Sequence, residues 1–405
     1  MGSNTSTVAG ILKRVYGDMI AQQQNLKHLT IDKFAKSRKQ YNPSGEGFFG
    51  AISDYGNESI GAINETEQFR TVDNENYVQY KVIPKNLVAP VEYSGRLARA
   101  AEGNEESFAA AVVDAIDNAR ERLLKDENRQ FFGLGTGLLA SPSANVASNL
   151  TSFTVDSAQY LRKNMVIDIF SGATKTVTAA RIQDVDKQSN VVYFSVSVGS
   201  ALVTTDQMVK QNIRDSAPTD GKEMIGLRGI VDDGTDLTTF QNIDASANRI
   251  WRGVNIAAGS ANLTSDLLQR LLDDTQTLGG NEPDLIVMHP KQRRKYLDIL
   301  VPEKRYLDQK LDAGHDKSSL MFNGKELLLD VDCQDSVVYA LSKANIMKFE
   351  MSPMAMGSED GSDVFLRLAN FDVFQAYWRH YCNFGTDKRN AHGKITGLSK
   401  PLGIS

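Results

Sequence analysis

Hydrophobic residues recur at helical spacing between Glu105 and Phe131. They form one apolar stripe, and acidic and basic residues occupy the other faces. Gly133, Gly135 and Gly137 follow directly, and glycine ends helices readily. The pattern therefore predicts one helix over 105–131, about 40 Å long at ~1.5 Å per residue. The stripe consists of Phe108, Val112, Ile116, Ala119, Leu123 and Phe131.

A similar apolar spacing predicts a helix near the start of the chain, over residues 8–39. The segment Asn42–Gly47 then breaks the pattern as a loop. Residues 1–40 carry seven lysines and arginines against two aspartates, a net charge of +5, so the other residues sum to −10. A basic arm on an acidic body favours different partners for the two surfaces, although a solvated helix face has the same pattern.

Residues 50–92 contain few candidate core positions. The first part, to residue 75, is polar and punctuated by glycines. The rest is rich in β-forming residues, with Pro84 and Pro90 interspersed, and proline favours an exposed ribbon or edge strand over a central strand. We expect this long, extended segment to lie on another surface.

Short alternating runs separated by turn residues predict a small antiparallel β module over 150–215. After it, the sequence predicts a helix that begins near Thr264 or Ser265 and ends at Gly279-Gly280. The other elements expected in this part are a buried strand at 283–288, a short helix at 290–300, and strands at 326–330, 337–341 and 365–368.

The composition is that of a globular protein. Of the 405 residues, 41% are hydrophobic and 23% charged, and this length favours two or three domains. No apolar run reaches the ~20 residues that a membrane-spanning helix needs, and we expect no signal peptide. The two cysteines, Cys333 and Cys382, form no Cys-x-x-Cys pair, which favours a reducing compartment and supports neither a zinc site nor a disulfide.

Candidate chemistry is sparse. The run Gly133–Gly137 follows a predicted helix, whereas a dinucleotide-binding loop follows a strand. Asp330, Asp332 and Asp335 could ligate a hard cation, which leaves a metal-dependent hydrolase as a remote alternative, but a turn between two strands explains them better. The histidines fit no catalytic motif. We therefore expect no enzyme, with no catalytic residues, cofactor or metal site.

The order of these features resembles the major capsid proteins of tailed bacteriophages, whose Hong Kong 97-type fold also forms encapsulin shells. The segment 80–92 is similar to the returning strand of the family's E-loop, and 104–133 to its spine helix. The segments 226–231, 267–272, 283–288 and 293–297 are similar to the axial A-domain, and 389–395 to the close of the peripheral P-domain.

The resemblance implies an α+β fold of the Hong Kong 97 type with an N-arm, an E-loop, a spine-helix P-domain, an A-domain and a β-rich insertion. The insertion has no counterpart in the common core, and we expect it on the outer surface. The implied parts are the basic N-terminal arm at 1–49, the E-loop at 50–92, the P-domain at 93–149, the insertion at 150–215, the A-domain at 216–350 and a return to the P-domain at 351–405.

The resemblance also implies the function of a major capsid protein, which self-assembles through hexamers and pentamers into an icosahedral shell around double-stranded DNA. The alternative within the same fold is an encapsulin-like compartment. Implied partners are further copies, packaged DNA bound non-specifically, portal protein, a separate scaffolding protein and a decoration protein, with no membrane. The implied location is the virion capsid, assembled in the host cytoplasm.

Two sets of residues are expected to make contacts in such a shell. The basic arm would face packaged DNA, or would pair with the acidic body of a neighbouring subunit. The E-loop would contact a neighbouring subunit. The arm residues are Lys27, Lys33, Lys36, Arg38 and Lys39, and the E-loop residues are Tyr77, Tyr80, Lys81 and Lys85.

Overall fold

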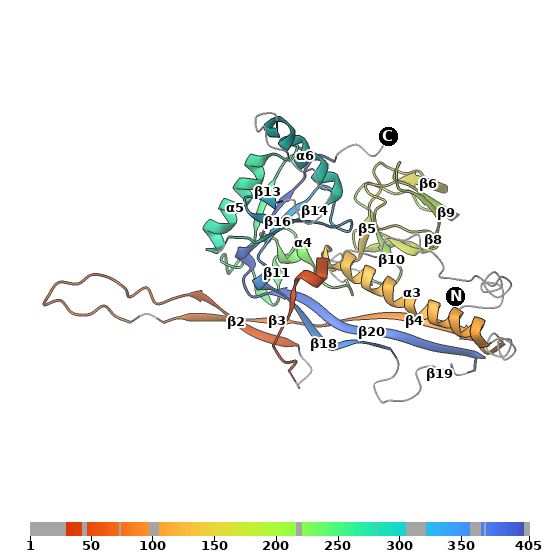
Figure 1. Ribbon diagram of the computed structural model, residues 1–405, viewed down its shortest axis with the longest axis horizontal. Coiled ribbons are helices and arrows are strands. Elements are labelled where there is room, and N and C mark those ends of the chain that lie inside the picture. The colour runs from red at the N-terminus through yellow and green to blue at the C-terminus, as the bar shows by residue number, and fades with distance from the viewer. Residues whose placement is uncertain are drawn as a thin grey trace. The chain divides into compact units, whose positions relative to one another are not determined.

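The computed structural model describes most of the chain and divides it into two compact units (Figure 1). Among the described residues, the smaller unit comprises Pro84–Asn128 and Glu350–Cys382. The larger unit comprises Thr30–Ile83, Arg129–Phe349 and the chain from Asn383 onward. The described residues are 30–42, 47–72, 74–96, 105–215, 221–280, 282–304, 321–356, 366–367 and 370–400.

The smaller unit combines one long helix with a sheet. Helix α3 spans Glu105–Phe131, the bounds that the apolar stripe predicts, and all but its last three residues lie in this unit. Strand β4 (Lys85–Ser94) pairs antiparallel with β20 (Val373–Thr386), from Ser94 opposite Val373 to Lys85 opposite Cys382. The Trp378 indole N–H of β20 donates to the Ile116 carbonyl of α3 at 3.0 Å, which fixes the helix to the strand.

Three further strands belong to this five-stranded sheet, β18 (Ile346–Met356), β19 (Leu366–Arg367) and β1 (Ala35–Lys36). Strand β19 confirms the strand expected at 365–368 within the residues described there. The sequence did not predict β18 or β20, the two longest strands of the sheet. The boundary between the two units falls within both of them.

The larger unit contains a six-stranded sheet covered by two helices. Its strands, in order across the sheet, are β13 (Val254–Ala257), β21 (Gly393–Thr396), β17 (Val338–Leu341), β14 (Leu285–Met288), β16 (Lys325–Leu329) and β15 (Met321–Phe322). The helices are α5 (Ser265–Gly279) and α6 (Pro290–Lys304). Leu268 and Leu271 of α5 pack with Ile286, Val338 and Ile395 of the sheet in one buried cluster.

The ends of α5 follow the sequence prediction. The Thr264 hydroxyl accepts a hydrogen bond from the Leu267 N–H at 3.2 Å, and Gly280 ends the helix at a φ of 67°. The predicted strands at 283–288, 326–330 and 337–341 are present as β14, β16 and β17. Strand β21 pairs with β13 and β17, so the chain from Asn383 belongs to the larger unit. The predicted single stretch 351–405 is therefore divided between the units at Cys382.

The β-rich module lies in the larger unit and has its own sheet and core. Across the sheet the order is β5 (Leu138–Ala140), β10 (Gln207–Lys210), β7 (Val166–Ser171), β8 (Thr174–Asp186), β9 (Val191–Val198) and β6 (Leu150–Thr154). Leu139, Ala140 and Val146 share a buried cluster with Ile167 and Met208. The module therefore begins at residue 138, not at 150, because β5 pairs with β10.

The module starts immediately after the glycine run. Gly135 and Gly137 adopt φ values of 83° and 75°, which suit glycine and separate α3 from β5. The module also docks on the turn between β16 and β17: the Tyr160 hydroxyl donates to the Asp332 carbonyl at 2.6 Å, and the Gln159 amide donates to the Cys333 carbonyl at 2.9 Å. It is thus hydrogen-bonded to the rest of the larger unit.

The helix predicted over 8–39 is wrong in its described part. Thr30–Lys33 forms a 3-10 turn, η1, and Ala35–Lys36 forms strand β1, which pairs in parallel with β18 at Met347 and Lys348. Phe34 is buried with its ring centroid 5.2 Å from that of Phe131. Long-range pairing and this aromatic contact outweigh the local helical spacing here. Residues 8–29 of the predicted helix lie outside the described part of the chain.

The predicted extended segment contains a two-stranded ribbon, β2 (Phe48–Tyr55) and β3 (Asn76–Val82), paired antiparallel. Figure 1 shows it projecting from the rest of the larger unit. The remaining short elements are α4 (Leu227–Ile230), β11 (Thr239–Phe240), β12 (Ile243–Asp244), η2 (Lys343–Asn345) and η3 (Arg389–Ala391). No helix in the described ranges is long and apolar enough to cross a membrane.

Candidate assembly surface

The ribbon tip, residues 56–75, exposes apolar side chains that the described part of the chain does not cover. Every residue from 60 to 72 is exposed, and Ile60, Phe69 and Val72 are 85%, 84% and 77% exposed. Burying a side chain of this kind contributes roughly 1.5–3 kcal/mol. Exposed apolar groups gathered on one extended segment are typical of a protein–protein contact surface.

Hydrogen bonds within the tip hold its two arms together. The Ser59 hydroxyl donates to the Thr71 carbonyl at 2.7 Å. At the turn, the Glu67 carboxylate accepts from the Asn64 N–H at 3.0 Å, and the Glu67 N–H donates to the Asn64 carbonyl at 3.1 Å. The tip is therefore a shaped surface, although it has no core.

The base of the ribbon is anchored in the larger unit. Phe48 packs on Phe349 with ring centroids 5.4 Å apart, and the Lys81 N–H donates to the Gln241 carbonyl at 2.9 Å. Tyr80 is fully buried, and its ring stacks on Trp251 at 6.4 Å. Tyr80 is thus a core residue of this chain, which contradicts the expectation that it contacts a neighbouring subunit.

The other three residues that were expected to contact a neighbouring subunit differ in their exposure to solvent. Tyr77 is 62% exposed on β3, and its hydroxyl donates to the Glu75 carboxylate, which raises the pKa of the phenol. The Lys81 ammonium lies 5.6 Å from the centre of the Phe49 ring, and Lys85 is half-buried in β4 of the smaller unit. Tyr77 is therefore the most accessible of the four residues.

Two of the basic arm residues make contacts within the larger unit. Lys33 forms an ion pair with Glu326 at 2.9 Å, and the hydrogen bond from Lys33 lowers the pKa of that carboxyl. The Lys39 ammonium lies 4.3 Å from the centre of the Tyr80 ring and donates to its hydroxyl. Lys36 and Arg38 are exposed, and Lys27 lies outside the described residues.

Solved structures share the fold of this chain. A chain of the cyanophage A-1(L) capsid asymmetric unit matches with a TM-score of 0.56 at 10% identity, over 95% of this chain and 97% of that one. The chain has the Hong Kong 97-type capsid fold. Its α+β class and its overall architecture were therefore predicted correctly from the order of elements in the sequence.

Two further solved structures match this chain with lower TM-scores. A structure from Microbacterium phage Oxtober96 matches with a TM-score of 0.48 at 10% identity, covering 97% of this chain and 98% of that one. The holo-SrpI encapsulin complex from Synechococcus elongatus matches with a TM-score of 0.45 at 9% identity, covering 98% and 97%. No family model and no curated protein matches the sequence.

The aspartates at 330–335 form a turn in this capsid fold, as the sequence indicated. The Asp330 carboxylate accepts from the Asp332 N–H at 2.7 Å and from the Thr30 N–H at 3.2 Å. The Asp335 carboxylate pairs with the Lys291 ammonium at 3.2 Å. These carboxylates bind donors of the protein itself, so the geometry gives no support to the hydrolase alternative.

A charge cluster lies in the larger unit of the capsid fold, with Asp232, Arg389 and Lys394 buried and Arg228 and Asp236 partly exposed at its edge. Lys394 lies 3.2 Å from Asp232 and 3.5 Å from Asp236, and Arg228 lies 3.1 Å from Asp236. Arg389 lies 3.5 Å from Asp232 and donates to the carbonyls of Gly229, Ile230 and Trp251. Burial lowers the pKa of Arg389 to about 10.

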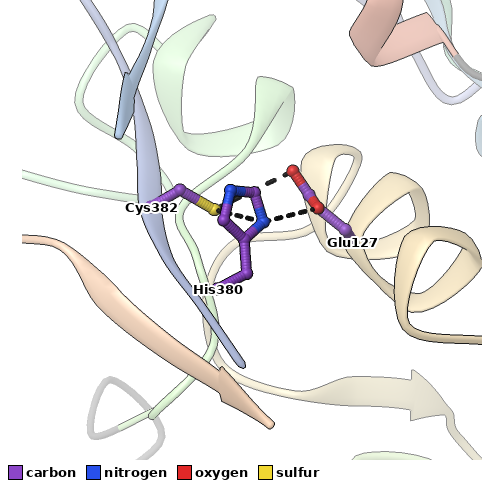
Figure 2. Close-up of side chains that lie close together, drawn as sticks. All are labelled: Glu127, His380 and Cys382. Carbon is purple, nitrogen blue, oxygen red and sulfur yellow. Dashed lines mark hydrogen bonds and ion pairs between the residues drawn. The ribbon is translucent and has the colours of Figure 1, made fainter. Parts of the chain in front are cut away.

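The described residues include one group of side chains with the donors that a transition metal prefers, Glu127, His380 and Cys382. Figure 2 shows Glu127 on α3 facing His380 and Cys382 on β20, and all three are buried in the smaller unit. The sequence analysis missed this group. His380 and Cys382 are two residues apart, so they share a face of any strand, but the strand itself was not predicted.

Proposed function

We propose that this chain is the major capsid protein of a tailed bacteriophage, which assembles into the icosahedral head shell around packaged double-stranded DNA. The observation that carries the proposal is the capsid fold, matched over nearly the whole chain to a chain of a cyanophage capsid. The exposed apolar ribbon tip supports it independently, because it is a surface suited to contact that the described part of this chain leaves uncovered.

A closed shell requires every subunit to bury area against several neighbours, beyond the about 1,600 Å² of one standard interface. An extended ribbon achieves this at small cost in chain length, because both of its faces are available to other subunits. Ile60, Phe69 and Val72 would fill that contact, and Tyr77 would border it. In this proposal the ribbon is the E-loop.

The remaining parts take corresponding roles. Helix α3 is the spine of the P-domain, together with β4 and β20. The sheet of β13, β21, β17, β14, β16 and β15 is the A-domain, and the module from residue 138 is an insertion on the outer surface. Lys36 and Arg38, together with Lys27, would face the packaged DNA, where contacts with phosphates are independent of base sequence.

The proposed partners follow from a shell of this kind. Copies of the chain form hexamers and pentamers in the host cytoplasm, and the finished shell is part of the virion. A portal protein, a separate scaffolding protein and a decoration protein are the further partners that such a shell would engage. We propose no catalytic activity for the chain.

Negative-stain electron microscopy and light scattering of the purified chain test the proposal. Closed shells or rings of capsomers are the expected result. A monomeric mass at all protein and salt concentrations, also when a scaffolding protein from the same genome is present, would overturn it. Genes for terminase and portal protein beside this gene would support a phage shell, whereas a neighbouring gene for an encapsulated enzyme would support the encapsulin-like alternative.

A further inference from the structure

The three donor atoms of the Glu127–His380–Cys382 cluster lie close together. The His380 Nδ1 atom is 3.1 Å from the Glu127 Oε2 atom and 3.5 Å from the Cys382 sulfur. The Cys382 sulfur is 3.8 Å from the Glu127 Oε1 atom. The sulfur, the imidazole nitrogen and the carboxylate oxygens therefore face one another (Figure 2).

These separations fit the ligands of one tetrahedral zinc ion. Zinc bonds of about 2.3 Å to sulfur and about 2.0–2.2 Å to nitrogen or oxygen place two ligand atoms about 3.4–3.6 Å apart. The observed separations of 3.1, 3.5 and 3.8 Å lie on both sides of that range. The nitrogen and the sulfur contact different oxygens of Glu127, and one donor atom from each residue lies within 4.8 Å of the other two, so the three ligand atoms would move closer together to bind one ion.

The second nitrogen of the histidine is also held in place. The His380 Nε2 atom lies 2.8 Å from the Glu350 Oε1 atom of β18. An N–H donated from Nε2 to this carboxylate leaves the lone pair of Nδ1 directed at the cluster. Histidines that bind zinc commonly donate their other N–H to a carboxylate in this way, which fixes the tautomer and the ring orientation.

The charges of the cluster also suit a divalent ion. The Glu127 carboxylate and a Cys382 thiolate together carry two negative charges, which the ion balances, and the imidazole remains neutral. Binding would release the thiol proton to solvent and would require no redox step. A thiolate and an imidazole together favour zinc over magnesium or calcium, which prefer oxygen ligands only.

We propose that Glu127, His380 and Cys382 bind a zinc ion that joins helix α3 to strand β20. The ligands lie 253 and 255 residues apart along the chain, so the ion acts as a structural clamp within the smaller unit. The fourth coordination position is left to a solvent molecule. The clamp would hold the helix against the strand whose Trp378 indole N–H also donates to the Ile116 carbonyl of the helix.

Elemental analysis of the full chain tests the proposal. The protein is produced in zinc-supplemented medium and purified without a chelator or a metal column, and about one zinc per chain is expected. The Cys382→Ala variant should lose the zinc. The matched control is Cys333→Ala, which removes the other buried cysteine, in the larger unit, and should retain the zinc.

Cobalt provides a readout that requires no variant. Wild-type protein produced in cobalt medium should show the visible absorption of tetrahedral cobalt and a thiolate-to-cobalt charge-transfer band. Wild-type protein without zinc and without these bands would overturn the proposal, and the three side chains would then form a hydrogen-bond network only. Equal zinc loss in Cys382→Ala and Cys333→Ala would also overturn it. Neither readout depends on shell assembly, so each is independent of the proposed function.

Discussion

In the larger unit, the ribbon tip exposes Ile60 and Phe69 almost completely, whereas the charge cluster buries Asp232, Arg389 and Lys394 almost completely. Each region reverses the usual preference of side chains for water or for the core. The charges are compensated inside the chain, by opposite charges and by backbone carbonyls. The apolar side chains of the tip are not covered by the described residues of the larger unit, so their partner is expected to be another molecule.

The contrast predicts two kinds of response to mutation. Changes in the buried polar groups should reduce the free energy of unfolding, because those groups cannot find replacements inside the protein. Changes in the ribbon tip should affect assembly and leave the folded chain unaltered.

Among the buried polar groups, protonation of histidine in acid should cause the largest loss of stability. The Ser342 N–H donates to His392 Nδ1 at 3.2 Å, so the neutral ring places its own N–H at Nε2, 3.1 Å from the Thr386 hydroxyl oxygen. Burial lowers the pKa of His392 to about 3 from its ordinary 6.5. The unfolded chain therefore binds the proton more readily, and stability is lost as the pH falls from 6.5 towards 3.

The complete difference between these two pKa values corresponds to roughly 5 kcal/mol. Urea unfolding at intervals from pH 7 to pH 5 would measure the first part of this loss, before carboxylates titrate. The variant His392→Asn keeps a side-chain acceptor and should show a flatter dependence. Burial also lowers the pKa of His289, to about 4, so His289→Asn is the companion variant. An unchanged slope in both variants would contradict this prediction.

Replacement of Arg389 by methionine should cost about 3–5 kcal/mol, because it leaves Asp232 buried with one positive partner fewer. The matched control is Arg270→Met, which removes an exposed i, i+4 pair with Asp274 at 3.4 Å and should cost less than about 1 kcal/mol. Chemical denaturation of the two variants measures the difference. Similar losses of unfolding free energy in the two variants would mean that burial of the cluster does not determine how much it stabilises the protein.

Weakening the contact between the β-rich module and the 330–335 turn should reduce the stability of the protein by an intermediate amount. Tyr160→Phe removes the hydroxyl that donates to the Asp332 carbonyl and should destabilise the protein by about 0.5–1.5 kcal/mol. Tyr193→Phe is the control, since this tyrosine is exposed on β9. Thermal melting would compare the two variants. A Tyr160→Phe protein as stable as the control would indicate that the module is attached by its core contacts alone.

The elements that could be predicted from the sequence are those determined by residues close together in the sequence. Helix α3 has its stripe, and α5 has Thr264 and Gly280 at its ends, so both could be predicted without knowledge of the rest of the fold. The order of such elements was then enough to indicate the capsid fold. Exposure along the ribbon followed from its lack of core residues. The predicted extended segment 50–92 was too long, because β4, which contains Pro90, pairs with β20 in the smaller unit.

The parts that it missed depend on residues far apart in the sequence. Ala35 and Lys36 are strand residues because β18 lies beside them, more than 300 positions later, so the helix predicted there was wrong. The module begins at 138 because β5 pairs with β10. Tyr80 is buried because Trp251 covers it, and Glu127 meets His380 across 253 positions. No local pattern carries such information.

The smallest expected effect on stability belongs to the double substitution Ile60→Ser and Phe69→Ser in the ribbon tip. Both side chains are more than four-fifths exposed, so their removal deprives the folded chain of almost no buried area, and the melting temperature should remain within experimental error. Assembly should nevertheless fail, because each side chain would contribute roughly 1.5–3 kcal/mol to every contact between subunits, and a shell contains one such contact for each copy.

The control for this prediction is Val196→Ser on β9 of the module, since Val196 is also an exposed apolar residue, at 73%. Its substitution should alter neither melting nor assembly, because the module is expected to face outward. Calorimetry would measure the first property, and light scattering with negative-stain microscopy the second. Normal shells from the ribbon variant would contradict the assignment of the tip as a contact surface, and failure of the Val196 variant would place an essential contact on the module. Loss of shells in the ribbon variant alone would show that the exposed apolar tip is compensated only between subunits.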